Sequence, residues 1–155
     1  MKTRIFNPTF ASFVLLLLGM PSALAQDCTI EMNVNDSIMF PETELSISKS
    51  ECSEVGINLN HGGSLPKMGG GHNWILTLSQ DADATAQDGM MALIENQFIK
   101  PGDERVIAAT DLIGGGESTS VTFSTENLEI DAVYTYFCSF PGHSYTMRGS
   151  LTITE

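Results

Sequence analysis

The stretch from residue 134 to residue 151 constrains the fold of this chain more than any other part of the sequence. Its first residues, largely aromatic and partly alternating with polar ones, predict a β-strand that ends at Cys138. A proline–glycine turn follows at 141–142, and a second strand begins near Met147. The thiol of Cys138, the imidazole of His143 and the thioether of Met147 therefore lie within ten residues, in a loop between two strands. The rest of the fold has to support this loop.

These side chains suit copper better than any other common metal, because thiolate and thioether favour Cu(I) while imidazole suits both oxidation states. A second histidine, His72, follows three glycines and precedes a predicted strand. It would complete a plane of two histidines and Cys138, with Met147 as a weak axial ligand, which is typical of a blue-copper electron-transfer site. Zinc is the chief rival, since two histidines and one cysteine also suit it. The methionine favours copper.

The first 25 residues predict a cleaved secretory signal peptide. The three parts of such a signal appear in order, namely a basic start at Lys2 and Arg4, an apolar run over 13–20 and a small-residue cleavage site over 23–25. A retained membrane helix is the weaker alternative, because the apolar run is too short to span a bilayer. Residues 26–155 would then form a single exported domain, which we expect in the periplasm.

Removal of this leader leaves 5 basic against 19 acidic side chains, a net charge of −14 with neutral histidines. Nucleic acid and anionic membrane surfaces are poor partners for such a protein. Solubility outside the cytoplasm is the simplest explanation of the acidic charge. Attraction to a basic partner ranks second.

The three cysteines are an odd number, and an oxidising compartment favours pairing of two of them. We expect a disulfide between Cys28 and Cys52, which leaves Cys138 free among the other candidate ligands. A free thiol outside the cytoplasm is a liability unless a metal occupies it. The alternative is an ordinary buried cysteine.

The remaining pattern predicts an all-β sandwich or barrel of about eight strands. Alternating or apolar segments indicate strands over 28–34, 37–40, 45–48, 55–59, 73–79, 105–109 with 112–113, 118–124, 134–138 and 150–154. Residues 61–71, with five glycines and a proline, indicate a loop. Residues 81–99 have helical spacing and predict one helical insertion outside the sheets. The single tryptophan, Trp74, is expected to anchor the core between the two sheets.

With these segments in place, the chain resembles the azurins, the bacterial blue-copper proteins of the cupredoxin family. The resemblance covers the whole chain after the leader and is most specific in the gaps of Cys138-x₄-His143-x₃-Met147 and in Gly71-His72-Asn73-Trp74. It implies a cupredoxin-like Greek-key sandwich that holds one type 1 copper ion. It also implies that the backbone carbonyl of Gly71 is a distant additional contact opposite Met147.

The same resemblance implies roles for residues around the ligands. Asn73 would tie the two ligand segments together through Ser139, and backbone N–H groups near Phe140 would bond the Cys138 sulfur and raise the reduction potential. His61 matches a histidine that lies near the copper without binding it and responds to pH. The alternative for His61 is an ordinary buried neutral histidine.

The resemblance further implies that electrons pass through the outer edge of His143, inside an apolar rim suited to transient docking. The rim residues are Leu65, Met90, Phe140, Pro141 and Gly142. Gly70 stands where azurins commonly have methionine, and Tyr145 replaces a smaller residue, so the docking patch is reshaped. The expected partners are redox proteins such as c-type cytochromes or a periplasmic reductase. The protein is expected to be a monomer.

Two functions fit these features. The first is a soluble exported carrier that shuttles one electron between redox partners through Cu(II)/Cu(I). The alternative is an exported protein for copper storage or delivery, which usually holds Cu(I) in an exposed site. Catalysis is not expected, because the proposed ligands leave no open position and His61 is the only other histidine in the sequence.

Overall fold

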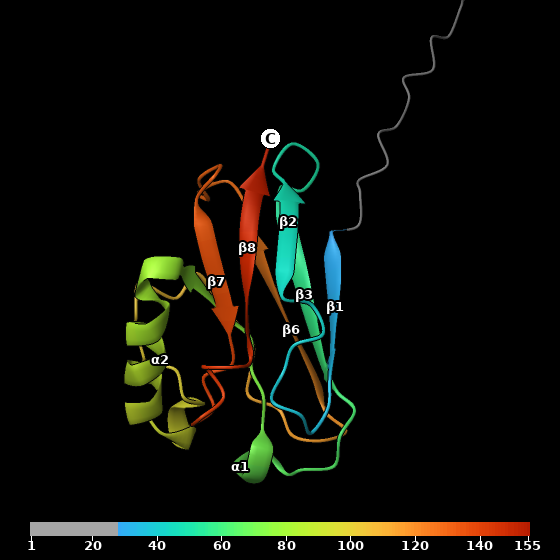
Figure 1. Cartoon of the computed structure of the whole chain (residues 1–155), viewed down its shortest axis with the longest axis vertical. Helices are drawn as coiled ribbons and strands as arrows, with labels where there is room; N and C mark the ends of the chain where they lie inside the picture. The colour runs from blue at the N-terminus through green and yellow to red at the C-terminus, as the bar shows by residue number, and fades with distance from the viewer. Residues whose placement is uncertain (1–27) are drawn as a thin grey trace, which may run out of the picture.

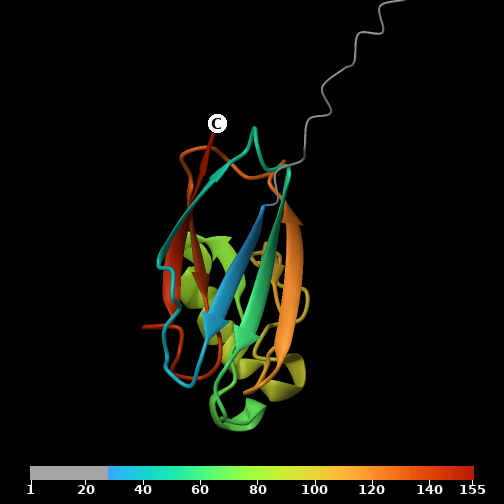
Figure 2. The same cartoon turned by 90° about the vertical axis from the view of Figure 1, so that its right-hand side faces the viewer.

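Two facing β-sheets make up the body of this protein, as Figures 1 and 2 show. The computed structural model describes residues 28–155, so the predicted leader lies outside the described residues. The first sheet has the order β1-β3-β6, with β1 at Thr29–Val34, β3 at Glu54–His61 and β6 at Ser118–Ser124. The second has the order β2-β8-β7-β4-β5, with β2 at Glu44–Ser48, β8 at Arg148–Thr154, β7 at Val133–Phe137, β4 at Ile75–Leu78 and β5 at Ala108–Ala109.

Pairing within the sheets is mixed. β1 pairs with β3 and β2 pairs with β8 in parallel, whereas the other neighbours are antiparallel. Because β1 and β2 lie in different sheets, the chain crosses between the layers right after its first strand. The eight strands within 28–155 confirm the predicted all-β sandwich.

Alternation along the strands explains why the sheets face each other. In β3, Val55, Ile57 and Leu59 are buried while their neighbours are more exposed. A buried aliphatic side chain of this kind contributes about 1.5–3 kcal/mol relative to an exposed one. The inner faces of both sheets therefore close over one apolar core.

Trp74 lies at the centre of that core and confirms its predicted role. It is fully buried, and its ring lies 6.0 Å from that of Phe123 in β6 and 5.6 Å from that of Tyr136 in β7. The first neighbour belongs to one sheet and the second to the other. The indole thus joins the two layers.

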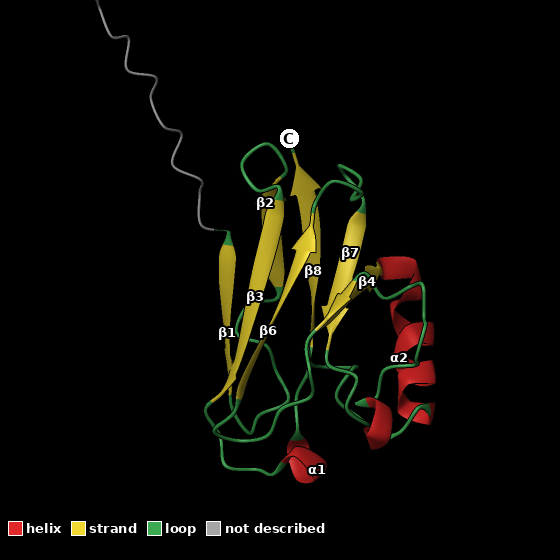
Figure 3. Ribbon diagram, turned by 180° about the vertical axis from the view of Figure 1, so that it is seen from behind, coloured by secondary structure: helices red, strands yellow, loops and turns green. Residues whose placement is uncertain are grey.

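The helical insertion lies outside the sandwich, as predicted (Figures 1 and 3). It comprises the 3₁₀ turn η1 at Ser79–Asp81, the helix α2 at Ala82–Met91 and the 3₁₀ turn η2 at Ile94–Asn96. Ala82 and Ala86 of α2 pack against Ile75 and Phe137 on the outer face of the five-stranded sheet. No helix among the described residues is long and apolar enough to cross a membrane.

Three local predictions were wrong in detail. Residues 37–40 are not a strand, because the Asn35 side chain accepts the Ser37 N–H at 2.8 Å and turns the chain away from sheet pairing. In the 105–113 segment, regular pairing is limited to β5 at 108–109, with an isolated bridge at Ile113. The glycine-rich loop contains the end of β3 and a single helical turn, α1 at Lys67–Gly70.

The two ends of the sandwich differ in content. We call the end that carries α1 and residues 35–39, 62–73 and 138–147 the α1 end; it lies at the bottom of Figure 1. The opposite, far end holds the start of β1 and the disulfide between Cys28 and Cys52, with Cα atoms 5.9 Å apart. This bridge confirms the predicted pairing and leaves Cys138 as the free cysteine of the described chain.

Candidate metal centre

The loop from Cys138 to Met147 is fixed by the strands that it joins. β7 and β8 are antiparallel neighbours in which Phe137 faces Arg148, so the next residue on each side begins the loop. The Cys138 N–H donates to the Met147 carbonyl at 3.0 Å, and the Met147 N–H donates to the His143 carbonyl at 2.8 Å. The loop is therefore closed by its own backbone and by the two strands.

His72 reaches the same place from a separate segment. Its backbone forms an isolated bridge with Ile113, the two N–H···O bonds measuring 2.9 and 2.8 Å. This bridge aims the His72 ring at the Cys138–Met147 loop from across the α1 end.

Three candidate ligand atoms converge there. Sγ of Cys138 lies 3.9 Å from Nδ1 of His72 and 3.6 Å from Nδ1 of His143, and all three atoms lie within 4.8 Å of one another. All three residues are buried. Among the described residues they form the one cluster of histidine, cysteine and acidic side chains with the spacing of a metal site.

The ring of His72 is held in one tautomer. Its Nε2 lies 2.9 Å from the backbone carbonyl of Asn35. Because a carbonyl only accepts, Nε2 carries the proton and Nδ1 keeps its lone pair toward the cluster. Burial lowers the pKa of His72, so the ring is neutral, as a ligand must be.

Burial also sets the protonation of the other two residues. Burial raises the pKa of the Cys138 thiol to about 12. The backbone N–H groups of Asn73 and Phe140 act in the opposite direction and lower this pKa, but their effect is smaller. Burial, with the nearby His72 ring, lowers the pKa of His143 to about 4. Two neutral imidazoles therefore face a thiol that stays protonated at neutral pH unless a cation replaces the proton. This donor chemistry fits a bound metal ion.

Asn73 joins the two ligand segments. Its Nδ2 donates to Oγ of Ser139 at 2.9 Å, and its Oδ1 accepts the Ser139 N–H at 2.8 Å. Asn73 follows His72 and Ser139 follows Cys138, so these bonds hold the neighbours of two candidate ligands together. The structure thus brings together the pair that the sequence singled out.

The backbone at Gly71 lies beside the cluster, its carbonyl oxygen 4.0 Å from Sγ of Cys138. A Cβ at this position would lie 2.5 Å from the Lys67 carbonyl and 3.0 Å from that of Ile113. The glycine is therefore required by the close packing of backbone around it. Met147 is fully buried in the same loop.

His61 lies directly behind His72, with ring centroids 4.7 Å apart and the planes nearly parallel. The Gly63 N–H donates to its Nδ1 at 3.1 Å, and its Nε2 faces the Gly70 carbonyl at 3.4 Å. A ring that accepts at Nδ1 is neutral. This contact favours the buried neutral histidine.

Of the predicted docking residues, Leu65 and those of the 140–143 turn belong to the α1 end, and Met90 lies near the C-terminal end of helix α2. His143 is 6% exposed, so only an edge of it reaches the surface, and the Phe140 ring lies 4.6 Å from it. Pro141 and Gly142 are exposed. Leu65 and Met90 are 40% and 42% exposed.

The two departures from the family pattern have different consequences. Gly70 is buried, and a Cβ there would lie 2.7 Å from Cδ1 of Leu65, so Leu65 covers the glycine. Tyr145, two residues after His143, is 90% exposed.

Asn35 and Asp36 hold this end of the molecule, and neither was predicted from the sequence. The Asn35 carbonyl fixes the His72 ring, while the Asp36 carboxylate accepts the N–H groups of Ser64 and Leu65 at 2.9 Å. An Asn-Asp pair after a strand is a turn signal, which could have indicated their position. A backbone carbonyl has no signature in the sequence.

Three comparisons with known proteins agree with this geometry. Residues 26–154 match the family model described as copper binding proteins, plastocyanin/azurin family. The chain is 39% identical to the azurin of Bordetella pertussis over 97% of this chain and 100% of that protein, and 42% identical to the azurin of Pseudomonas aeruginosa over 90% and 93%. The solved structure of the azurin Az-iso2 from Methylomonas sp. strain J has a TM-score of 0.79 and 44% identity, over 84% of this chain and all of that one.

Proposed function

Since this chain belongs to the plastocyanin/azurin family of copper-binding proteins, we propose that His72, Cys138, His143 and Met147 hold its copper, with the Gly71 carbonyl as a weaker contact. The protein is a blue-copper electron carrier, and its cofactor is one type 1 copper ion. The observation that supports the ligand assignment is the convergence of Nδ1 of His72, Nδ1 of His143 and Sγ of Cys138. Met147 is included in the ligand set because it is buried in the same closed loop.

Bound copper supplies a reversible one-electron couple between Cu(II) and Cu(I). The chain holds the ligand atoms in one arrangement for both states. His72 cannot rotate without losing its bond to the Asn35 carbonyl, and Cys138 is tied through its own N–H to Met147. Burial of the site excludes water, so little rearrangement accompanies a change of charge.

This arrangement favours retention of the metal over its delivery. The ligands come from two separate segments, each fixed by the sandwich, and all of them are buried. A delivery protein needs an exposed site from which Cu(I) can leave. Catalysis is not part of the proposal, because four side chains and a carbonyl leave no position for substrate.

The electron is proposed to pass through the outer edge of His143. The surrounding apolar rim of Leu65, Met90, Phe140, Pro141 and Gly142 would dock a redox partner transiently. Suitable partners are c-type cytochromes or a periplasmic reductase, approached by a monomer. The net charge of −14 after leader removal would modulate encounter but not decide the contact, because the rim is uncharged.

The proposal also places the working protein outside the cytoplasm. Cleavage after Ala25 would release one domain, residues 26–155, into the periplasm. The Cys28–Cys52 disulfide supports this location, because such bonds persist in oxidising compartments.

Titration of the copper-free protein with Cu(II) tests the ligand assignment. Wild type should turn intensely blue through charge transfer from the Cys138 thiolate, and Cys138→Ser should stay colourless. Met147→Leu should keep the colour and change the reduction potential, because a thioether would be a weak ligand of the copper. A blue Cys138→Ser variant would show that the site is elsewhere.

Cyclic voltammetry separates the carrier from the storage or delivery protein. A carrier gives fast, reversible one-electron transfer at an electrode. Delivery would instead appear as rapid loss of Cu(I) to a competing chelator.

A further inference from the structure

The segment after helix α2 has an unusual backbone. Leu93, Gln97 and Phe98 have φ of 62°, 56° and 57°, in the left-handed region that side chains seldom adopt. Such conformations persist where the surroundings impose them, and they gather at functional sites. The surroundings of Gln97 connect this segment to the metal centre.

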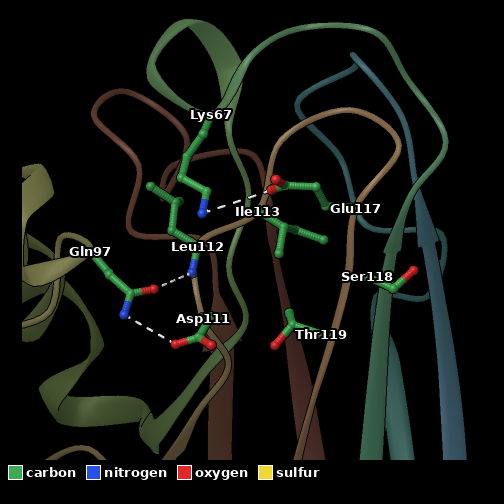
Figure 4. A pocket seen from close by; sticks show the side chains of 8 residues that line it. All are labelled: Lys67, Gln97, Asp111, Leu112, Ile113, Glu117, Ser118 and Thr119. Atoms are coloured by element: carbon green, nitrogen blue, oxygen red, sulfur yellow. Dashed lines mark hydrogen bonds and ion pairs between the residues drawn. The ribbon is translucent and has the colours of Figure 1, made fainter.

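Both ends of the Gln97 side-chain amide are engaged by the segment that runs up to Ile113. Its Oε1 accepts the Leu112 N–H at 2.7 Å, and its Nε2 donates to Oδ1 of Asp111 at 3.0 Å. Figure 4 shows the amide pointing at these two groups. Leu112 precedes Ile113, whose backbone bridges to His72. The side chain therefore ties the insertion to the segment that holds one ligand.

The backbone carbonyl of Gln97 reaches the other ligand segment. It accepts one N–H of the Asn73 amide at 3.0 Å, while the second Asn73 N–H goes to Ser139. Asn73 is fully buried. If the Gln97 carbonyl moved away, one N–H of the buried Asn73 amide would lose its hydrogen-bond acceptor. A buried donor without an acceptor is destabilising.

We propose that Gln97 is a positioning residue for the metal centre. Its side chain locks onto residues 111–112, so that its left-handed backbone presents the carbonyl to Asn73, and Asn73 holds Ser139 beside Cys138. His72 is bridged to Ile113, the Gln97 side chain bonds the neighbouring Leu112, and the Gln97 carbonyl bonds Asn73, which follows His72 in the chain. The proposal rests on the proposed ligand set for what is positioned, since Gln97 touches none of the ligands.

Gln97 should affect the reduction potential through the hydrogen bonds to the Cys138 sulfur. Backbone N–H groups of Asn73 and Phe140 face Sγ of Cys138. A looser Asn73 weakens these contacts, which leaves more electron density on the sulfur and favours Cu(II) over Cu(I). The reduction potential should fall.

The test exchanges hydrogen-bonding roles between two side chains. Gln97→Glu places a second carboxylate against Asp111 and breaks the contact. Gln97→Glu with Asp111→Asn restores it, because the new asparagine amide donates to Glu while Glu still accepts the Leu112 N–H. Gln87→Glu is the control, since Gln87 is an exposed glutamine of α2 and the change of charge is the same.

Two measurements are made on each variant. In the copper-free protein, amide hydrogen exchange of Ser139 should quicken about tenfold in Gln97→Glu, while the β1–β3 ladder keeps its protection. In the copper-loaded protein, the ratio of Cu(II) to Cu(I) affinity should rise about tenfold, a fall of about 59 mV for a one-electron couple. The double variant should restore both values, and Gln87→Glu should change neither.

Wild-type Ser139 exchange in Gln97→Glu, or no restoration in the double variant, overturns the proposal. A change in exchange without a change in potential also overturns it, because Gln97 would then be a structural clamp. If Gln97→Glu fails to fold, Gln97→Met removes both side-chain bonds without adding charge, with Gln87→Met as its control. An error in the ligand set would appear separately, in the colour of Cys138→Ser.

Discussion

The α1 end and the far end of the sandwich are held by different forces. The far end is crosslinked by the Cys28–Cys52 disulfide and rests on the apolar core, and its hydrogen bonds, such as that from Thr125 to the Cys52 carbonyl, orient no candidate ligand. At the α1 end, side chains and carbonyls bond backbone and ring groups one by one, as Asn35 bonds His72 and Asn73 bonds Ser139. Apolar burial is not directional, whereas ligand atoms need fixed directions. Stability and metal geometry should therefore respond to different substitutions.

The core should give the largest effect on stability and the smallest on the site. Leu151 in β8 is fully buried, so Leu151→Ala should lower the free energy of unfolding by about 2–5 kcal/mol through lost burial and a cavity. Urea unfolding of the copper-free protein measures this. The spectrum and potential of the copper-loaded folded protein should stay as in wild type. A large change in reduction potential in Leu151→Ala would contradict the contrast between the two regions.

Removal of the disulfide should act in the same way and somewhat less strongly. Cys28→Ala with Cys52→Ala opens a loop with a sequence separation of 24 and should cost about 3 kcal/mol in the chain-entropy model. Thermal unfolding with and without reductant gives the comparison, because reductant should weaken wild type and leave the variant unchanged. An altered copper spectrum in the variant would contradict the separation of the ends.

Asn73→Ala should reverse the pattern. It breaks the bonds to Ser139 and Gln97 and should cost about 1–3 kcal/mol in unfolding free energy, less than the core substitution. It should nevertheless lower the reduction potential, because the Cys138 sulfur loses well-placed N–H groups. Voltammetry and urea unfolding of the same preparations decide this. An unchanged potential would mean that the loop is fixed without Asn73.

Much of this arrangement was predictable from the sequence, because its signals are local. Alternation and turn residues predicted the sandwich, and ligand spacing indicated the Cys138–Met147 loop. What failed depends mostly on contacts that no strand pattern records. Residues 37–40 have strand-like side chains, but the Asn35 side chain accepts the nearby Ser37 N–H, and the Asp36 carboxylate accepts the distant Ser64 N–H. The role of Gln97 depends on its left-handed backbone conformation and on a contact with Asn73, 24 residues away in the sequence. No local sequence pattern predicts either feature.

Electron-transfer kinetics sharpen the comparison at the surface. Met90 in the predicted docking rim and Ile130 in the turn between β6 and β7 are both 42% exposed, so Met90→Asp and Ile130→Asp add the same charge at equal exposure. Met90→Asp should slow self-exchange and reaction with a cytochrome about tenfold, because docking would bury an unpaired charge. Stopped-flow rates at low and high salt provide the measurement, with unchanged spectra as a check. Equal rates in the two variants would place the docking contact elsewhere.

The smallest effect is expected from Asp36 and depends on pH. The N–H groups of Leu65 and Ser64 lower the pKa of its carboxyl, so the contribution of this contact to stability is present above the unfolded value of about 3.9 and is lost as pH falls through the folded value. Exchange of the Ser64 and Leu65 amides in wild type should therefore quicken on acidification below about pH 4. Asp36→Asn should lack this step, and a step of equal size in the variant would assign it to another group.

The position of Trp74 has an optical consequence. In the described part of the chain its indole N–H has no hydrogen-bond partner, and its ring lies between Phe123 and Tyr136 with no exposed surface. An indole excited in such a place finds no mobile dipoles to relax around it, so its fluorescence should emerge at short wavelengths, as in a hydrocarbon solvent. Because this is the only tryptophan in the sequence, the emission colour reports directly whether the two layers remain closed on each other. The molecule thus contains its own gauge of core integrity, separate from the blue colour expected at the α1 end.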